Sequence, residues 1–503
     1  MSNPLKKLAG QTAIYGLGTV MPRILNYLLT PILTYEFSAA EFGINSELYA
    51  YISFLNVIFT YGMETAFFNF NSKLENKQDV FSTSFWSLLL SSTVFSGLLL
   101  LFTSNIANEL STPNAVYLPQ FIVWSILIIA TDAIAIIPFA KLRTEGKALK
   151  FSLLKLTNII INFGLTIFFL KICKSSYDLC EVNSYAALYN PQIGIGYVFL
   201  SILIANVITL ILLGNQLIGI KFNINLQLLK KMLSYAWPLI ILGLAAMIND
   251  TLDKIIIKKL MLDKSEAQIA QGIYGACNKI AVLMSIFIQS FRFASEPFFF
   301  GKAKEKDSKQ TYAIVMKYFI IFCLFLFLAM VMNLDWIQYI LESHYREGLK
   351  VVPILLMAYL CLGVVYNQSI WYKLSGKTRF GAIIAITGAA ITLVVNILFV
   401  PKYSYMACAW ATLAAYGGMM LLSYILGQIY FPIKYNLRAI SVYCFLAFSF
   451  YLISYLYSDI DNTALKLILN NLWLILFVWI IYKMEFSTLK KLNSHGSNST
   501  ESN

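Results

Sequence analysis

Charged residues are scarce in this chain: they make up 13% of its 503 residues, whereas hydrophobic residues make up 59%. Soluble proteins carry about 25% charged residues, so the chain has too little charge to cover a set of ordinary globular domains. A disordered chain is excluded as well, because disorder requires low hydrophobicity. The composition therefore predicts a protein whose main solvent is lipid.

The residues and motifs of common enzyme sites are also scarce. There are two histidines, His344 and His495, which argues against histidine-based catalysis and His-rich metal sites. The seven cysteines form no CxxC pair and no metal-ligand spacing. No Walker A, GxSxG, HExxH or GxGxxG motif stands in a fitting context. We therefore expect no enzyme activity, no bound metal and no cofactor.

What is abundant is long apolar runs. A membrane-spanning helix needs about 20 mainly apolar residues, and we find fourteen such segments. They cover residues 11–35, 46–70, 81–102, 117–140, 151–170, 193–213, 235–257, 272–300, 312–332, 351–372, 380–400, 406–430, 439–457 and 465–482. An even number of spans places both termini on one side of the membrane.

The net charge of +13 has a topological explanation. Of the 38 Lys and Arg residues, 23 fall in the loops and tails on the side of the termini, and nine fall on the opposite side. The positive-inside rule then predicts cytoplasmic termini, and the excess charge requires no nucleic-acid partner. Six cations remain inside the spans, namely Arg23, Lys155, Lys254, Lys279, Arg292 and Lys317.

The loops between spans are short. None is much longer than about 20 residues, and the longest are 171–192 and 333–350. A membrane glycosyltransferase or polysaccharide polymerase usually carries a larger extramembrane domain. Many spans with short loops indicate a secondary transporter, whose site lies in the interior of the helix bundle.

A local repeat supports two related halves. The second span follows Gly43 and ends in Glu64-Thr-Ala-Phe-Phe, and the eighth follows Gly272 and ends in Glu296-Pro-Phe-Phe-Phe. The two spans are six apart, as expected for a parallel repeat of six helices. Chance similarity in a chain with 37 phenylalanines is the alternative.

Residues 5–68, which begin LKKLAGQTAIYGLGTVMPRILNYLLTPILTYEF, resemble the opening of bacterial polysaccharide-biosynthesis flippases. These belong to the multidrug/oligosaccharidyl-lipid/polysaccharide exporter superfamily. The run SYAWPLIILGLAAMINDTLDKIIIKKL and the following GIYGACNKIAVLMSIFIQSFRFASEPFFF are similar to the start of that family's second half. The length, the fourteen spans and the short loops match along the whole chain.

The resemblance implies an all-α fold of two pseudo-symmetric six-helix lobes around a central cavity. The lobes would be residues 1–230 and 231–433, followed by an extra helix pair at 434–484 and a disordered cytoplasmic tail at 485–503. It implies alternating access in the bacterial inner membrane. It also implies a substrate, a polyprenyl-pyrophosphate-linked oligosaccharide destined for O-antigen, capsule or exopolysaccharide. A coupling ion (proton or sodium), membrane lipid and polysaccharide assembly proteins are the other expected partners.

A pyrophosphate that crosses the membrane needs positive charge inside the bundle, where an isolated charge costs at least about 2.5–3.5 kcal/mol. Arg23 is the first candidate, because it lies deep in the first span between Pro22 and Pro31. Arg292, Lys155 and Lys317 are further candidates for the substrate cavity. The structural alternatives are binding of Arg23 to backbone carbonyls, an interfacial pair between Arg292 and Glu296, and snorkelling of the lysines.

Carboxylates inside spans are candidates for ion coupling or gating. Asp132 lies in the middle of the fourth span, and Asp250, Asp253 and Lys254 cluster in the seventh. Glu64 and Glu296 lie near the ends of the second and eighth spans, and Pro297 predicts a helix break at Glu296. The alternatives are an Asp132 pair with Arg23 or Lys155, and a seventh-span cluster that lies near water.

Three other functions remain open at this point. A multidrug or organic-cation exporter of the same superfamily would have the same fold, although those proteins typically have twelve spans. A membrane polymerase or acyltransferase is disfavoured by the small loops and the lack of a His/Asp constellation. A membrane scaffold would not require buried cations.

Overall fold

The computed structural model describes residues 4–179, 185–218, 220–303, 305, 307–457 and 462–498. Side chains are described from Val20 onward, except those of residues 293, 294, 296, 297 and 487–498. Within these residues the chain forms helices, and its one β-type pairing is an isolated bridge between Thr112 and Ala115. The prediction of an all-α fold is confirmed.

The helices fall into two halves and a C-terminal pair. The first half consists of α1 (Pro4–Glu36), α2 (Ala39–Thr60), α3 (Met63–Lys73), α4 (Lys77–Leu100), α5 (Thr103–Leu110), α6 (Pro119–Thr144), α7 (Ala148–Ile167), α8 (Lys174–Asp178) and α9 (Gly196–Leu213). The second half consists of α10 (Leu226–Leu260), α11 (Lys264–Lys302), α12 (Ser308–Met332), α13 (Leu334–Ile337), the 3₁₀ helix η5 (Ser343–Val351), α14 (Val352–Gln368), α15 (Ile370–Leu374), α16 (Arg379–Tyr403) and α17 (Tyr405–Tyr430). The pair is α18 (Leu437–Leu456) and α19 (Thr463–Asn498).

Twelve helical segments in the described part of the chain are long and apolar enough to cross a membrane. They correspond to the third to fourteenth predicted spans. The first and second predicted spans fold as α1 and α2, which lie outside this set of twelve. Because the first four turns of α2 are largely buried, Asn45, Ser46 and Glu47 are covered by neighbouring helices and not by lipid. A helix in this position does not need the hydropathy of a lipid-facing span.

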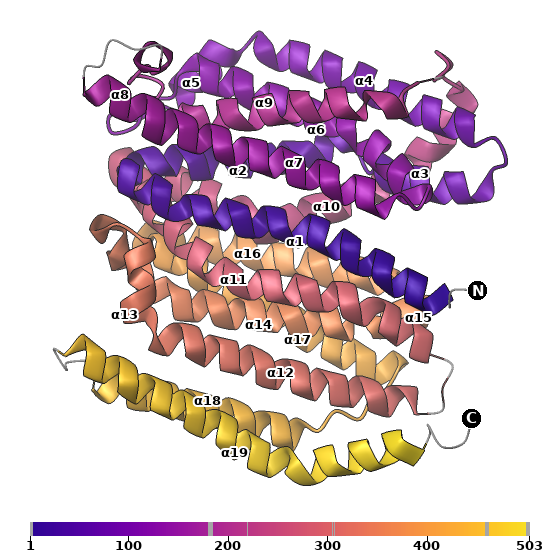
Figure 1. Cartoon of the computed structure of the whole chain (residues 1–503), viewed down its shortest axis with the longest axis vertical. Helices are drawn as coiled ribbons and strands as arrows, with labels where there is room; N and C mark the ends of the chain where they lie inside the picture. Colours follow the sequence, from indigo (N-terminus) through magenta and orange to yellow (C-terminus); the bar gives the residue numbers. More distant parts are fainter. Residues whose placement is uncertain are drawn as a thin grey trace.

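The long helices run side by side, and both termini lie at the same end of the bundle (Figure 1). We call this end the terminal end and the opposite one the far end. Helix α1 contacts α7 of the first half and α11 of the second, and α2 contacts α6, α10 and α11. Helices α1 and α2 therefore carry most of the contact between the halves. The α18–α19 pair packs on α12, at the outer side of the second half.

Local sequence explains where α2 begins and ends. Ser38 and Glu41 form a reciprocal capping box at its start. At its end, Tyr61 and Gly62 both adopt left-handed backbone angles, with φ of 35° and 69°. The predicted span 46–70 is therefore interrupted, and Glu64 lies in the first turn of a separate helix, α3.

Two of the predictions concern helix ends. The break predicted at Glu296 is wrong, because α11 continues through Pro297 to Lys302. Proline removes one backbone hydrogen bond, and only the last turn of the helix follows it. Helix α19 continues past residue 485, where we predicted a disordered tail to begin. Glu485 itself is buried and bound to Lys317, which anchors this part of the helix to α12.

Candidate functional site

Four charged or polar side chains from four helices meet between the halves. Arg23 on α1 lies within electrostatic range of Asp250 on α10, Arg292 on α11 and Tyr366 on α14. Tyr366 lies within range of Asp250 and Arg292 as well. The guanidinium carbon of Arg292 lies 4.9 Å from the centre of the Tyr366 ring. Arg23, Asp250 and Arg292 are exposed. Exposed charges on α10 and α11, two helices with membrane-span composition, indicate a water-accessible space inside the bundle.

The Asp250 carboxylate is held in place by the second half. The hydroxyl of Tyr416 on α17 donates a hydrogen bond to it at 2.6 Å. One turn further along α10, Asp253 is buried and accepts a hydrogen bond from the hydroxyl of Tyr274 on α11. The two predicted carboxylates therefore differ: Asp250 faces the space between the halves, whereas Asp253 ties α10 to α11.

Two lysines extend the charged surface towards the far end. Lys254 lies one turn from Asp250 and is close enough to Lys279 for the two charges to interact. Lys279 also lies 6.0 Å from the ring centre of Tyr49 on α2. Lys279 and Arg292 are 13 residues apart on α11, which corresponds to about 20 Å of helix. We call Arg23, Lys254, Lys279 and Arg292 the cationic column.

A small cavity adjoins the column at Arg292. It is also lined by Ser295, Tyr366, Asn367 and Lys373. The side-chain nitrogen of Asn367 is buried and has no hydrogen-bond partner among the described residues. An unsatisfied buried donor costs about 1–3 kcal/mol, and the cavity beside this amide, of about 10 Å³, has room for no more than one water molecule.

A second polar cavity, of about 320 Å³, lies within the first half. Its lining includes Asp132, Lys155 and Glu64, so the structure brings together three predicted site residues from three helices. Asn206 on α9 donates a hydrogen bond to Asp132 at 3.0 Å, and Lys155 lies within electrostatic range of Asp132. Glu64 forms a 2.9 Å ion pair with Arg143 at the terminal end of the cavity. This arrangement is separate from the cationic column.

The halves meet at the far end in a close contact between α2 and α11. A Cβ added to Gly272 would lie 1.8 Å from the carbonyl oxygen of Ala39 and 3.1 Å from the backbone nitrogen of Gly43. Gly43 and Gly272 are the glycines from which we inferred the internal repeat. In this structure they bring the two repeated helices into backbone contact, which only residues without a Cβ allow.

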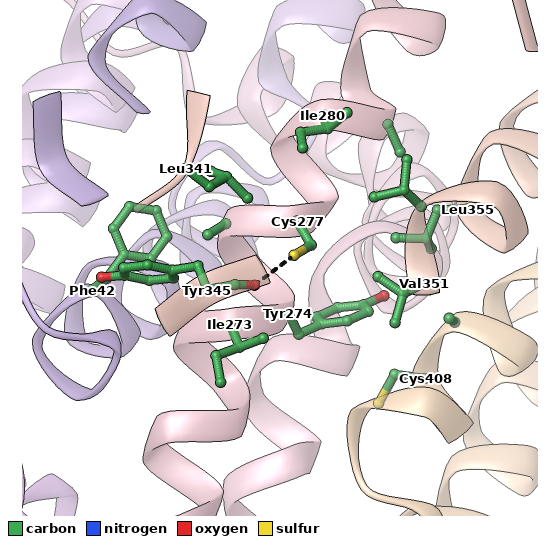
Figure 2. Close-up of a cluster of buried hydrophobic side chains, with 14 of the residues drawn as sticks. Phe42, Ile273, Tyr274, Cys277, Ile280, Leu341, Tyr345, Val351, Leu355 and Cys408 are labelled. Atoms are coloured by element: carbon green, nitrogen blue, oxygen red, sulfur yellow. Dashed lines mark hydrogen bonds between the residues drawn. The ribbon is translucent and has the colours of Figure 1, made fainter. Parts of the chain in front are cut away.

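Buried apolar side chains surround this contact. Figure 2 shows Phe42 of α2 against Tyr345 of η5, with Cys277 of α11 directed at the Tyr345 backbone. The Phe42 and Tyr345 rings are 5.7 Å apart and nearly perpendicular. The Tyr345 hydroxyl donates a hydrogen bond to the Phe37 carbonyl at 2.7 Å. The far end is therefore closed by packed side chains from both halves.

An ion pair is buried in the same contact. The ammonium of Lys258 at the end of α10 donates to Glu47 of α2 at 2.9 Å, and the two side chains are 7% and 2% exposed. Lys258 also donates to the Leu110 carbonyl, and Glu47 accepts a second hydrogen bond from the Tyr117 hydroxyl. These bonds satisfy both charges, as burial requires. We call the α2–α10–α11 interface around this pair the far-end contact.

The remaining predicted residues lie elsewhere. Lys317 pairs with Glu485 at 2.5 Å, where α12 meets α19, and both side chains are almost fully buried. The hydroxyls of Tyr318 and Tyr443 also donate to Glu485. The side chain of Glu296 lies outside the described residues.

Some residues of these groups escaped the sequence prediction. The predicted span boundaries place Lys258 in a loop, and the predicted site does not include Glu47. The available signals are a carboxylate early in the second span and a lysine one turn after Lys254. Lys279 is one of the six cations predicted inside spans but is not among the predicted site residues. No sequence feature distinguishes Tyr366 and Tyr416 from the other tyrosines, of which the chain has 31 in all.

Comparison with known proteins gives one family and two similar solved structures. A family model described as polysaccharide biosynthesis protein matches residues 8–301. A structure of the lipid II flippase MurJ in an inward closed conformation is 15% identical, with a TM-score of 0.68, and the match covers 94% of this chain and 100% of that chain. An inward-facing multidrug resistance MATE transporter of the MOP superfamily is 13% identical, with a TM-score of 0.60, and the match covers 83% of this chain and 94% of that one. A search of curated proteins finds no match.

Proposed function

The chain belongs to the polysaccharide biosynthesis protein family, and from this premise we propose that it is a flippase for polyprenyl-pyrophosphate-linked oligosaccharide units. It carries them from the cytoplasmic to the outer leaflet of the bacterial inner membrane, for assembly of a surface polysaccharide. The membership and the shared fold make it a flippase or transporter of the MOP superfamily. The substrate, the direction and the coupling are the proposal.

The cationic column is the observation that carries the proposal. Arg23 lies near Arg292, and Lys254 lies near Lys279. About 20 Å of α11 separates Lys279 from Arg292. A pyrophosphate headgroup carries several negative charges, and it must be compensated along its whole path through a low-dielectric region. Arginine side chains bind phosphate oxygens with a planar fork of donors, so Arg23 and Arg292 are the proposed primary contacts.

Two features support the direction of transport. The terminal end carries most of the loop lysines and arginines, which supports its assignment to the cytoplasm by the positive-inside rule. The far-end contact closes the opposite end. This combination fits a state that receives substrate from the cytoplasmic side. Release would require the far-end contact to separate.

Ion coupling requires a titratable or ion-binding group that changes state during the cycle. Asp132 in the first-half cavity and Asp250 beside Arg23 are the proposed groups. Asp132 has polar neighbours, including Asn206 and Lys155, within the 320 Å³ cavity. A proton or sodium ion is the expected partner of these carboxylates. Asp253, Lys254, Glu64 and Glu296 stay candidates for gating.

An exporter of organic cations is the second candidate, because the same fold occurs in the MATE transporter. The cationic column disfavours it. The positive charges of the column repel a cationic ligand, and repulsion of this kind is a common means of excluding wrong ligands. An anionic headgroup is attracted by the same residues.

The test is to deplete the protein in a strain that makes a surface polysaccharide and to measure the lipid-linked oligosaccharide in each leaflet. Accumulation in the cytoplasmic leaflet is expected, together with loss of surface polymer. Arg23→Ala and Arg292→Ala should insert normally but fail to restore export, whereas Arg438→Ala on α18, outside the column, should restore it. Normal polymer after depletion would refute the flippase function, and normal export by both column variants would remove these arginines from the site.

A further inference from the structure

A cavity of about 690 Å³ lies at the far end, and the buried Glu47–Lys258 pair forms part of its lining. The first half supplies its apolar wall, which includes Ile52 and Leu55 of α2, Phe102 before α5, and Ile126 and Ile129 of α6. The lining runs along α2 from Glu47 to Leu55, which are eight positions apart, or about 12 Å. The cavity is therefore a deep apolar slot with a polar end.

The second half supplies three lysines to this polar end. Lys258 is neutralised by Glu47. Lys259 and Lys264 are exposed, and neither has a carboxylate partner within the described part of the chain. Lys264 donates to the carbonyls of Lys258 and Lys259 at 2.9 and 3.4 Å, which leaves one ammonium proton for another acceptor. With Glu109 also at the rim, the uncompensated charge is positive.

Exposed apolar side chains adjoin lining residues in the sequence: Leu101 precedes Phe102, and Leu262 lies between Lys259 and Lys264. Leu101 is 77% exposed and Leu262, between the two rim lysines, is 96% exposed. In a membrane-spanning chain such side chains lie in hydrocarbon or at its border, and lysines just beyond them lie at headgroup level. The slot therefore opens where the acyl region of the far leaflet meets its headgroups.

We propose that this slot binds an anionic phospholipid of the far leaflet, with one acyl chain along α2 and α6 and the phosphate between Lys259 and Lys264. The chemistry of the site matches the two parts of such a lipid. The apolar wall packs against the acyl chain, and the two lysines attract the negative headgroup. Asn105 at the rim provides an additional polar contact for the glycerol or headgroup oxygens.

The proposed lipid would contact both halves at once. Its chain lies on the first half, whereas its headgroup lies on lysines of the second, next to the far-end contact. When the far end opens, α10 moves away from α2 and the two parts of the site separate. A ligand that binds one conformation better shifts the population towards it, so the lipid favours the state with a closed far end. This inference goes beyond the proposed transport function, and lipid binding is measurable without any substrate.

The binding test uses the purified, delipidated full-length chain in detergent, titrated with POPG or POPC and measured by native mass spectrometry. POPG should bind more tightly than POPC. Each lysine near an anionic headgroup contributes about fivefold in affinity, so Lys259→Ala with Lys264→Ala should weaken POPG binding roughly 25-fold. Lys402→Ala, an exposed lysine on α16 outside the slot, is the matched control and should leave it unchanged.

A POPG analogue with a photoreactive acyl chain locates the bound lipid. It should label peptides of α2 and α6, and labelling should fall in the double lysine variant. Equal affinity for POPG and POPC, or labelling confined to other helices, would overturn the proposal. Displacement of POPG by a tighter-binding polyprenyl phosphate would also overturn it, because the slot would then belong to the substrate lipid.

The conformational effect has a separate readout. Spin labels at Val116 and Leu262, exposed far-end positions on the two halves, should show a larger short-distance population in POPG than in POPC membranes. The difference should disappear in the Lys259→Ala/Lys264→Ala variant. An unchanged distance distribution with preserved POPG binding would refute the coupling while leaving the binding site in place.

Discussion

Replacing Lys258 by methionine should open the far end of the molecule. Methionine keeps the length of the side chain but leaves the Glu47 carboxylate buried with the Tyr117 hydroxyl as its remaining partner. Both side chains of the wild-type pair are more than nine-tenths buried, so solvent screening does not reduce the effect. Removing one partner of a buried ion pair costs about 3–5 kcal/mol.

This penalty applies to the closed state, because Glu47 would reach water when α2 and α10 separate. Since 1.4 kcal/mol is a factor of ten in an equilibrium constant, the lower figure of about 3 kcal/mol shifts the population towards the open state by more than about 100-fold. Replacing both partners, by Glu47→Leu with Lys258→Met, removes the uncompensated charge. Such apolar replacements are often close to neutral, so the double variant should close again.

The native Cys277 reports on this equilibrium. It is fully buried in the far-end packing, where its sulfur lies 3.4 Å from the Tyr345 carbonyl oxygen. Its rate of reaction with a membrane-impermeant maleimide, followed by peptide mass spectrometry, should rise strongly in Lys258→Met and return towards wild type in the double variant. Lys302→Ala, which removes an exposed 2.8 Å pair with Glu305 at the terminal end, should not change it.

Two results would refute this reasoning. A Cys277 rate in Lys258→Met equal to that of the wild type would show that the ion pair does not hold the far end closed. A double variant as reactive as the single one would show that lost packing, and not an unpaired charge, is responsible.

Three further predictions follow from other contacts. Gly272→Ala should raise Cys277 reactivity, because the added Cβ would lie 1.8 Å from a backbone oxygen and weaken the closed state by about 1–3 kcal/mol or more. Gly97→Ala is the control, since Gly97 has open space around it. Equal Cys277 rates in the two variants would contradict the close contact. Lys317→Met should lower the free energy of unfolding, measured by thermal denaturation, by about 3–5 kcal/mol. Adding Glu485→Leu should restore most of the lost stability. An unchanged unfolding temperature in the single variant would show that the pair does not stabilise the fold. Asp132→Asn keeps an oxygen that can accept the hydrogen bond from Asn206 but removes the negative charge. It should abolish the dependence of transport on the ion gradient while preserving the fold. A wild-type dependence on the gradient would exclude Asp132 from coupling.

The sequence predicted the third to fourteenth spans well, because each depends on about 20 consecutive residues. Apolar runs such as 193–213 need no tertiary information. It predicted the second span less completely. The break at Tyr61–Gly62 depends on backbone angles, and Gly62 also lies against Ala236 of α10, a contact that no local pattern reveals. The break expected at Pro297 did not occur, because a proline near a helix end removes little.

The candidate site was predictable only in part. Charges inside spans pointed to Arg23, Asp250 and Arg292, and the structure brings these three together. The same rule selected Lys317, which the structure pairs with Glu485 on a helix 168 residues away. The rule missed Glu47 and Lys258, since a short distance between two charges from different spans cannot be read from either span.

By itself the sequence determined that this chain spans a membrane and that it is helical. It also determined that the loop cations gather on one side of the membrane. Lipid imposes these properties on each segment separately. Only the tertiary structure decided which charges share a space. It assigned Arg23, Lys254, Lys279 and Arg292 to one column, Asp132 and Lys155 to a second cavity, and Lys258 and Lys317 to buried ion pairs. The physical reason is that the energy of a charge inside the bundle depends on its neighbours from other helices, and packing alone selects those neighbours.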